Sequence, residues 1–392
     1  MTDAIYLDNN ATTRPAPEVV ESMMPYLCEC YGNPSSLHRP GVQARDALIR
    51  ARAQVAELIG AKPQEIVFTS GCTEANHLAI LGALAVSSGK RRIVSSGVEH
   101  ASTLALLRDL EAQGFQVRLL PVDRDGRLDC GQFERTLDSQ TALVTLMWAN
   151  NETGVIFPIP TLAAIAKSRG ILFHADAAQV VGRIPVDARN CGADLISFSG
   201  HKFHAPKGVG GLFIRTGLNW PALIRGSQER RRRGGTENLP AIVAMGAACS
   251  LAAAQIECDI RRISSLRNRL EAGIVESIPW VTINGDTANR LPNTSNLCFG
   301  ALDGEAILAR LDRADIYASS GAACSSGGTE PSHVLSAMGL RRDRALASIR
   351  LSLSRYTTEA EIEQVLEVLP GIIKELAAEY SAAGGSLRLE LT

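Results

Sequence analysis

Four polar side chains of different chemistry each come just after a short apolar run of the sequence. They are the imidazole of His100, the amide of Asn151, the carboxylate of Asp176 and the ammonium of Lys202. In an open parallel sheet, ligands bind outside the carboxyl ends of the strands. Taken singly, each residue has an ordinary alternative as a helix cap or a solvated loop residue. As a set, they would converge on one crevice, and this convergence predicts a site.

A turn of small residues, 69–76, follows another apolar run and opens a helix. The free amides and the positive dipole end of such a helix would hold a phosphate, although a capped helix without a ligand explains the turn equally well. No Gly-Lys-Ser/Thr of a Walker loop follows, and no G-x-G-x-x-G follows a strand. The pattern therefore disfavours a dinucleotide or a nucleoside triphosphate.

Together these groups suit pyridoxal phosphate. Its aldehyde reacts with a lysine, its pyridine nitrogen needs an acid that keeps it protonated, and its phosphate needs a helix N-terminus. Asp176-x-x-Gln179, followed by Ser199-x-His201-Lys202, supplies these groups in a workable order. The residues themselves thus predict a pyridoxal phosphate site.

The elements that would position this site form an α/β pattern. Short runs that are apolar on both faces suit buried, mostly parallel strands, and helical stretches such as 101–113 and 159–168 fill the gaps between them. Seven such runs lie between about residues 60 and 215: 65–69, 92–95, 117–120, 143–147, 171–174, 195–198 and 211–214.

The chain changes character after about residue 258. Helical patterns over 241–254 and 261–277 lead out of the sheet, strands are predicted near 295–299 and 348–353, and a final helix begins at the capping box Thr358-x-x-Glu361. We expect a large α/β domain over 15–258, with a mostly parallel seven-stranded sheet. Residues 1–14 and 259–392 would form a smaller α+β domain.

Composition narrows the class of protein. The 392 residues are 45% hydrophobic and 21% charged, as in soluble globular proteins. A net charge of −1 gives no electrostatic reason to expect nucleic acid or an anionic membrane as a partner. The first residues do not resemble a signal peptide, and no apolar span of about 20 residues is expected, so we predict a cytoplasmic protein. Nine cysteines without a CxxC pair indicate neither a zinc finger nor a thioredoxin-type site.

Over essentially its whole length, the chain resembles the cysteine desulfurases, which are class V members of the fold-type-I pyridoxal phosphate enzymes. Nine separated motifs carry the resemblance, in the expected order: residues 6–13, 32–38, 69–76, 99–100, 150–154, 174–179, 197–202, 233–238 and 319–325.

The resemblance implies a role for each matching residue. Lys202 would bind the cofactor covalently, Asp176 would pair with the pyridine nitrogen, Gln179 would contact the phenolic oxygen, and His100 would stack on the ring. The phosphate would be held by Thr73, the backbone at Cys72, Ser199 with Gly200, His201, and Thr236 from the other subunit of a homodimer. Asn151 would lie beside cofactor and substrate, and Arg350 would grip the substrate carboxylate. The arginines at 230–233 are then interface or cofactor-site residues rather than a macromolecular binding patch.

The implied reaction converts L-cysteine to L-alanine. The amine of Lys202 would remove the substrate Cα proton, with His100 as a general acid or base, and the Cys324 thiolate would take the sulfur as a persulfide. Residues 318–329 are small and contain three glycines, which predicts a mobile loop that carries this sulfur to an external acceptor. As a persulfide, Cys324 could also ligate an iron–sulfur cluster transiently; no other metal site is expected.

The Cys-Ser-Ser surround of Cys324 resembles the group that serves iron–sulfur scaffold proteins. The C-terminal tail does not resemble that of the housekeeping type, which favours a nitrogen-fixation, NifS-like enzyme. The alternatives are a class V aminotransferase or selenocysteine lyase on the same fold, which would not need Cys324 or would ignore L-cysteine, and a non-catalytic sulfur carrier, in which Lys202 or Asp176 would be missing. Both residues are present.

Overall fold

The computed structural model describes residues 4–320 and 330–382. Its centre is a seven-stranded sheet in the order β2-β8-β7-β6-β5-β3-β4. Each of the seven apolar runs forms one strand, which confirms the expected sheet. The strands are β2 (Ile66–Thr69), β3 (Arg92–Ser96), β4 (Gln116–Leu120), β5 (Thr141–Met147), β6 (Leu172–Asp176), β7 (Leu195–Ser199) and β8 (Gly210–Ile214).

Strand direction in this sheet is mostly parallel. Strands β4, β3, β5, β6 and β7 pair in parallel, whereas β8 runs antiparallel to both β7 and β2. The strands β2 and β7 therefore point the same way, and the turn after β2 lies at the same sheet edge as the ends of β5, β6 and β7. At Gly210, an added Cβ would lie 2.7 Å from the Cα of Gly71, so glycine allows β8 to pass beside this turn.

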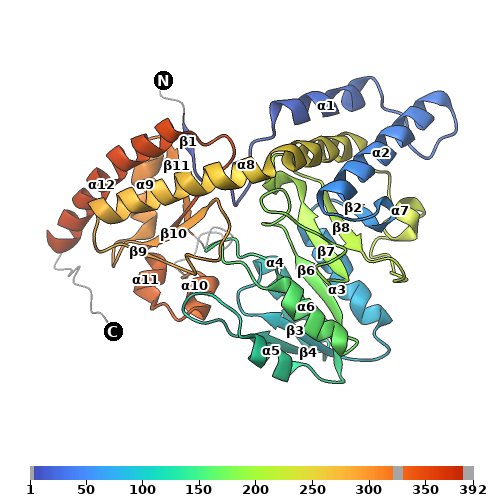
Figure 1. The fold of residues 1–392 in the computed structure, drawn as a ribbon, viewed down its shortest axis with the longest axis horizontal. Helices are drawn as coiled ribbons and strands as arrows, with labels where there is room; N and C mark the ends of the chain where they lie inside the picture. The colour runs from blue at the N-terminus through green and yellow to red at the C-terminus, as the bar shows by residue number, and fades with distance from the viewer. Residues whose placement is uncertain (1–3, 321–329, 383–392) are drawn as a thin grey trace.

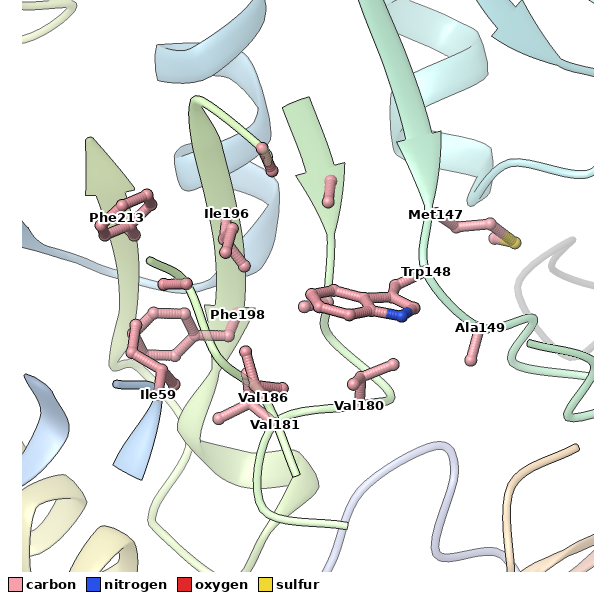
Figure 2. Close-up of a cluster of buried hydrophobic side chains, with 14 of the residues drawn as sticks. Ile59, Met147, Trp148, Ala149, Val180, Val181, Val186, Ile196, Phe198 and Phe213 are labelled. Carbon is pink, nitrogen blue, oxygen red and sulfur yellow. The ribbon is translucent and has the colours of Figure 1, made fainter. Parts of the chain in front are cut away.

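Helices cover both faces of the sheet because successive side chains of a strand point to opposite faces. Leu195 and Leu212 pack on one face with α3 and α4, while Ile196 and Phe213 pack on the other with α1, α2 and α6. Figure 2 shows Ile196, Phe198 and Phe213 on that second face, with Trp148 and Val180 from the loops that follow β5 and β6. The helices of this part are α1 (Pro17–Cys28), α2 (Arg39–Leu58), α3 (Cys72–Val86), α4 (Ala101–Ala112), α5 (Cys130–Thr136), α6 (Ile159–Ser168) and α7 (Gln228–Arg231), with 3-10 turns η1 (Pro63–Glu65) and η2 (Gly200–Lys202).

A second hydrophobic core lies around a four-stranded sheet in the order β12-β13-β10-β9. Ile5 and Leu7 of the N-terminal segment belong to this core, and β1 pairs with β11 beside it. The elements of this part are β1 (Ile5–Tyr6), β9 (Thr282–Ile283), β10 (Thr294–Cys298), α9 (Gly304–Arg313), β11 (Ile316–Tyr317), β12 (Ser319–Ser320), α10 (His333–Ala337), α11 (Arg342–Leu346), β13 (Ser348–Ser352) and α12 (Glu359–Ala382). The capping box forms at the start of α12: the Thr358 amide donates to Glu361 at 2.6 Å, and the Glu361 amide donates to the Thr358 hydroxyl at 3.2 Å.

One helix joins the two cores. α8 runs without a break from Leu239 to Ser277, so it contains both helical stretches expected from the sequence, 241–254 and 261–277, and the residues between them. Its first half packs in the core of the large sheet and its second half in the other core, so residue 258 falls inside a helix. Figure 1 shows α8 passing from the side of α1 and α2 to the side of α9 and α12.

The start of α8 also corrects the expectation about apolar spans. Within the described residues, α8 is the one helix long and apolar enough to cross a membrane by length and composition, and half of its most apolar 18-residue window is buried inside the protein. Since α8 packs against α1 and α2, its apolar residues have an internal packing role.

Candidate active site

A cavity of about 580 Å³ opens at the carboxyl ends of the large sheet, between the two cores. The loops after β2, β5, β6 and β7 line it, together with the N-terminal segment and β13. Ten of the residues singled out in the sequence line this cavity: Cys72, Thr73, His100, Asn151, Asp176, Gln179, Ser199, His201, Lys202 and Arg350.

The ammonium of Lys202 lies at the end of η2, directly after β7. Its Nζ donates to the carbonyl oxygens of Asn10 and Ala11, at 2.7 and 2.8 Å. The N-terminal segment thus lies across the lysine, although nearly two hundred residues separate them in the sequence.

The carboxylate of Asp176 is 7% exposed and is held on both oxygens. Oδ2 accepts from the Asn76 side chain at 2.7 Å, while Oδ1 accepts from the Ala178 amide at 3.0 Å and from the Cys72 thiol at 3.3 Å. Burial, and next the charge of Asp176, raise the pKa of Cys72 well above its usual value. Cys72 therefore stays a neutral thiol, and its contact with Asp176 is that of a weak donor.

His100 caps α4 through its ring. Nδ1 lies 2.8 Å from the Ser102 hydroxyl and accepts from the Ser102 amide at 3.2 Å. Because Nδ1 is an acceptor, the proton of the neutral ring is on Nε2, an assignment made from the hydrogen bonds. Burial lowers the pKa of His100, so the ring is neutral near pH 7.

Gln179 is positioned by two residues that the sequence analysis did not single out. Its Nε2 donates to the Asn10 carbonyl at 3.1 Å, and its Oε1 accepts from Arg183. Arg183 also donates to the backbone oxygens of Asn9 and Lys202, at 2.8 and 3.1 Å. Burial, and next the charge of Arg350, lower the pKa of Arg183 to about 9. Arg183 thereby links the N-terminal segment to the turn after β7 that carries Lys202.

Arg350 lies on β13 with its side chain 4% exposed. Nη2 donates to Asp8 Oδ1 at 2.6 Å, and Nη1 donates to the Asn151 carbonyl at 3.0 Å. Its buried Nε has no hydrogen-bond partner in the described part of the chain. The guanidinium is therefore held in place by Asp8 and retains a donor that an anionic ligand could use.

The N-terminus of α3 lines the cavity. Its N-cap is Gly71, which makes no side-chain capping bond, and Cys72, Thr73 and Glu74 of the first turn are among the lining residues. Ser199 and His201 line the cavity with this turn. The His201 Nδ1 lies 3.1 Å from the Thr12 hydroxyl, and burial, followed by the charge of Lys202, lowers its pKa to about 4.

Two proposed residues are placed elsewhere, and one lies outside the described residues. Gly200 is buried, and its amide donates to the Val209 carbonyl at 3.0 Å, so it does not line the cavity. Thr236 is exposed and is not among the residues that line the cavity of its own chain. Cys324 lies in the undescribed segment 321–329. Among residues 4–320 and 330–382, no group of three or more His, Cys, Asp or Glu side chains could hold a metal ion.

The sequence analysis missed Asp8, Asn10, Asn76 and Arg183 as site residues. The first three lie within motifs that were recognised, so position in a motif was the available signal for them. Arg183 has no such signal, because its partners come from segments at residues 9–10, 179 and 202.

Comparison with known proteins identifies the family. The profile for class-V aminotransferases matches residues 5–365. Cysteine desulfurase from Trichormus azollae is 51% identical over 95% of this chain and 94% of its own length, and cysteine desulfurase NifS from Azotobacter vinelandii is 46% identical over 95% and 93%.

Solved structures give the same result. A NifS-like protein superposes with a TM-score of 0.90 at 36% identity, covering 95% of this chain and 100% of that one. Apo cysteine desulfurase from Thermococcus onnurineus superposes with a TM-score of 0.86 at 28% identity, covering 95% of each. The chain belongs to the class-V aminotransferase family and, within it, to the cysteine desulfurases.

Proposed function

We propose that this protein removes sulfur from L-cysteine, releasing L-alanine and leaving the sulfur on Cys324, with pyridoxal phosphate bound at Lys202. The observation that carries the proposal is the convergence, in one cavity, of the Lys202 ammonium, the Asp176 carboxylate, the His100 imidazole and the α3 N-terminus.

The residues of the cavity fit this cofactor. The uncapped α3 N-terminus, with Thr73, Ser199 and His201, offers donors to a phosphate. Asp176 faces the cavity as a carboxylate held by three donors, which suits a protonated pyridine nitrogen. Lys202 is within the same cavity, and Gln179 and His100 line its walls. Thr236 would complete the phosphate site from a partner subunit.

The bound cofactor would supply an electron sink for the substrate Cα. The protein's own residues would supply the proton transfers. As a free amine, Lys202 would take the Cα proton at Nζ, and the carbonyl oxygens of Asn10 and Ala11 would hold the resulting ammonium. His100 carries its exchangeable proton on Nε2, so it can give that proton up and recover it while Ser102 holds the ring in place.

Arg350 would bind the substrate carboxylate. Its guanidinium now bridges Asp8 and the Asn151 carbonyl, so an entering carboxylate would share or replace the Asp8 contact. Charge-assisted bonds to a planar guanidinium fix the orientation of a carboxylate as well as its affinity.

The sulfur step is a two-electron transfer that needs no external oxidant. The Cys324 thiolate attacks the substrate sulfur, an S–S bond forms, and the C–S bond breaks with its electron pair left on the carbon fragment. That fragment takes up a proton at Cβ, regains the proton that it lost from Cα, and leaves as L-alanine. The protein cysteine is left as a persulfide.

The exposed surface supports a homodimer. Six of the large exposed apolar side chains belong to α1, α2 and the turn between them: Val20, Met24, Leu27, Tyr31, Leu37 and Ile49. Exposed apolar patches mark interaction surfaces, so these side chains are the proposed dimer interface. We propose further that an iron–sulfur scaffold protein accepts the sulfur and that the product serves nitrogenase clusters, a role supported by the NifS name of the Azotobacter relative.

Product analysis of two lysine variants tests the proposal. Wild type, incubated with L-cysteine and a thiol reductant, should release alanine and sulfide in equal amounts. Lys202→Ala should lose the visible absorbance of the bound cofactor and release neither product. Lys207→Ala, which removes a second lysine from the cavity lining, should keep the absorbance. Pyruvate, or alanine without sulfide, would instead indicate a lyase or a transaminase.

A further inference from the structure

A chain of hydrogen bonds runs through the sheet behind Asp176 and ends on that carboxylate. It begins at Thr145 on β5, crosses to His174 on β6 and Ser197 on β7, and reaches Asn76 on α3. The contacts are Thr145 Oγ1 to His174 Nδ1 at 2.8 Å, His174 Nε2 to Ser197 Oγ at 3.0 Å, Ser197 Oγ to Asn76 Oδ1, and Asn76 Nδ2 to Asp176 Oδ2 at 2.7 Å.

The donor and the acceptor of each hydrogen bond in this chain follow from its last residue, Asp176. An ionised Asp176 can only accept, so Asn76 must present its NH₂ group to it and its Oδ1 to Ser197. The second N–H of Asn76 faces the Thr103 hydroxyl at 3.4 Å, which supports this orientation of the amide. Ser197 then donates its only proton to Asn76.

The same reasoning fixes the histidine tautomer. Since Ser197 has donated its proton, its oxygen accepts from His174, which must carry a proton on Nε2. The Nδ1 atom is then an acceptor for the Thr145 hydroxyl. In each of the four hydrogen bonds, the donor is the residue farther from Asp176 along the chain.

This chain is buried throughout. The exposed fraction of Thr145, His174, Ser197 and Asn76 is 2% or less. Burial lowers the pKa of His174 to about 4, so the ring is neutral at physiological pH. A neutral, fully paired histidine in this position orients and polarises its neighbours, because aligned hydrogen bonds in a low-dielectric interior strengthen one another.

We propose that His174 is a positioning residue that acts through Ser197 and Asn76 to hold the Asp176 carboxylate in the orientation that pairs it with the cofactor's ring nitrogen. The inference deepens the proposed function and rests on it. Donors aimed at a carboxylate lower its basicity. The shared proton then stays on the ring nitrogen, where it is needed for the ring to accept electrons from the substrate Cα.

The test compares two buried serines of the same sheet. Ser197→Ala interrupts the chain next to Asn76. Ser95→Ala is the matched control: Ser95 is equally buried, but its hydroxyl donates to the Thr145 backbone carbonyl and lies outside the chain. Two readouts are independent of turnover: the ¹⁵N chemical shift of the ring nitrogen of labelled pyridoxal phosphate in the holoprotein, and the dissociation constant of the cofactor titrated into apoprotein.

For Ser197→Ala we expect a ¹⁵N shift toward the unprotonated pyridine value and about tenfold weaker cofactor binding, the scale expected for a lost bond next to a charged group. Ser95→Ala should match wild type in both readouts. His174→Gln keeps a donor toward Ser197, so its ¹⁵N shift and cofactor dissociation constant should be closer to the wild-type values than those of Ser197→Ala. Thr145→Val is a nearly isosteric change at the far end of the chain. It should move the ¹⁵N chemical shift of the ring nitrogen in the same direction as Ser197→Ala, but by a smaller amount. It replaces Ser197→Ala in the test if that variant does not fold.

A wild-type ¹⁵N shift in both Ser197→Ala and Thr145→Val would overturn the proposal. Equal shifts in Ser95→Ala and Ser197→Ala would also overturn it, because the effect would then be one of general packing. If wild type binds no pyridoxal phosphate, the proposed function fails together with this inference, whereas a protonated wild-type ring that is insensitive to Ser197→Ala refutes this inference alone.

Discussion

At the residue scale, the contact between Arg350 and Asp8 bears on the proposed binding of the substrate carboxylate. The guanidinium is already oriented in the absence of substrate, by Asp8 on one nitrogen and by the Asn151 carbonyl on another. In the proposed function, a substrate carboxylate would share or replace the Asp8 contact of a side chain that is already ordered, so little affinity would be lost to side-chain ordering.

Arg350→Lys should raise the KM for L-cysteine roughly 10- to 100-fold, because a lysine cannot make the two parallel bonds of a guanidinium. The visible absorbance of the cofactor should not change. Steady-state kinetics measured alongside the absorbance spectrum checks both statements. An unchanged KM with a lower kcat would remove Arg350 from substrate binding and leave it a structural residue.

At the element scale, the short helix α10 is fixed directly against the site loops. The Ser332 hydroxyl donates to Glu152 Oε2 at 2.5 Å, and His333 Nε2 lies 2.9 Å from the Glu99 carbonyl. Glu152 and Glu99 are the sequence neighbours of Asn151 and His100. Val334 and Leu335 of α10 pack in the core of the large sheet, whereas β12, on the other side of residues 321–329, pairs within the smaller sheet.

Burial raises the pKa of Glu152 to about 7, which makes the anchor of α10 sensitive to pH. The unfolded-state pKa is near 4.5, so the native protein holds a proton there that the unfolded chain releases between about pH 4.5 and 7. The Glu152 contribution to stability is therefore fully present below pH 4.5 and is lost as pH rises through 7.

Glu152→Gln removes this titration while keeping an acceptor for Ser332. Relative to the variant, wild-type apoprotein should be less stable at pH 8 than at pH 5.5, as measured by urea unfolding at both values. A stability difference between the two proteins that does not depend on pH would mean that Glu152 is ionised in the native state.

The sequence predicted some elements well and others poorly, for physical reasons. β5 and β7 are buried along their whole length, and their mostly apolar sequences correctly predicted buried strands. The helical patterns at 241–254 and 261–277 left residues 255–260 unassigned, and these belong to α8, where they lie between its two buried halves and none of them is buried. Residues just past strand ends were recognisable as site residues because sheet geometry brings such positions together. Arg183 was not, because its role depends on contacts with Asn9 and Asn10, which lie about 170 residues away in the sequence.

At the scale of the whole molecule, the exposed apolar surface on α1, α2 and the turn between them predicts self-association. Leu37 is 88% exposed there, whereas Leu119, 51% exposed, lies on the edge strand β4 in another part of the molecule (Figure 1). Leu37→Asp should weaken the dimer, because a buried unpaired carboxylate is costly at an interface. Leu119→Asp should not. Sedimentation velocity over a range of concentrations measures both, and a dimer that only Leu119→Asp dissociates would place the interface elsewhere.

The whole molecule brings Lys202, Asp176 and Arg350 into one cavity, and the central proposal is that L-cysteine bound there loses its sulfur to Cys324. The most direct test is a single turnover with L-cysteine in the absence of reductant, with alanine quantified and the peptide containing Cys324 analysed by mass spectrometry. The proposal predicts one alanine for each sulfur atom added to Cys324, and neither product in Cys324→Ser. Alanine formed without added sulfur on that peptide, or formed equally by Cys324→Ser, would contradict it.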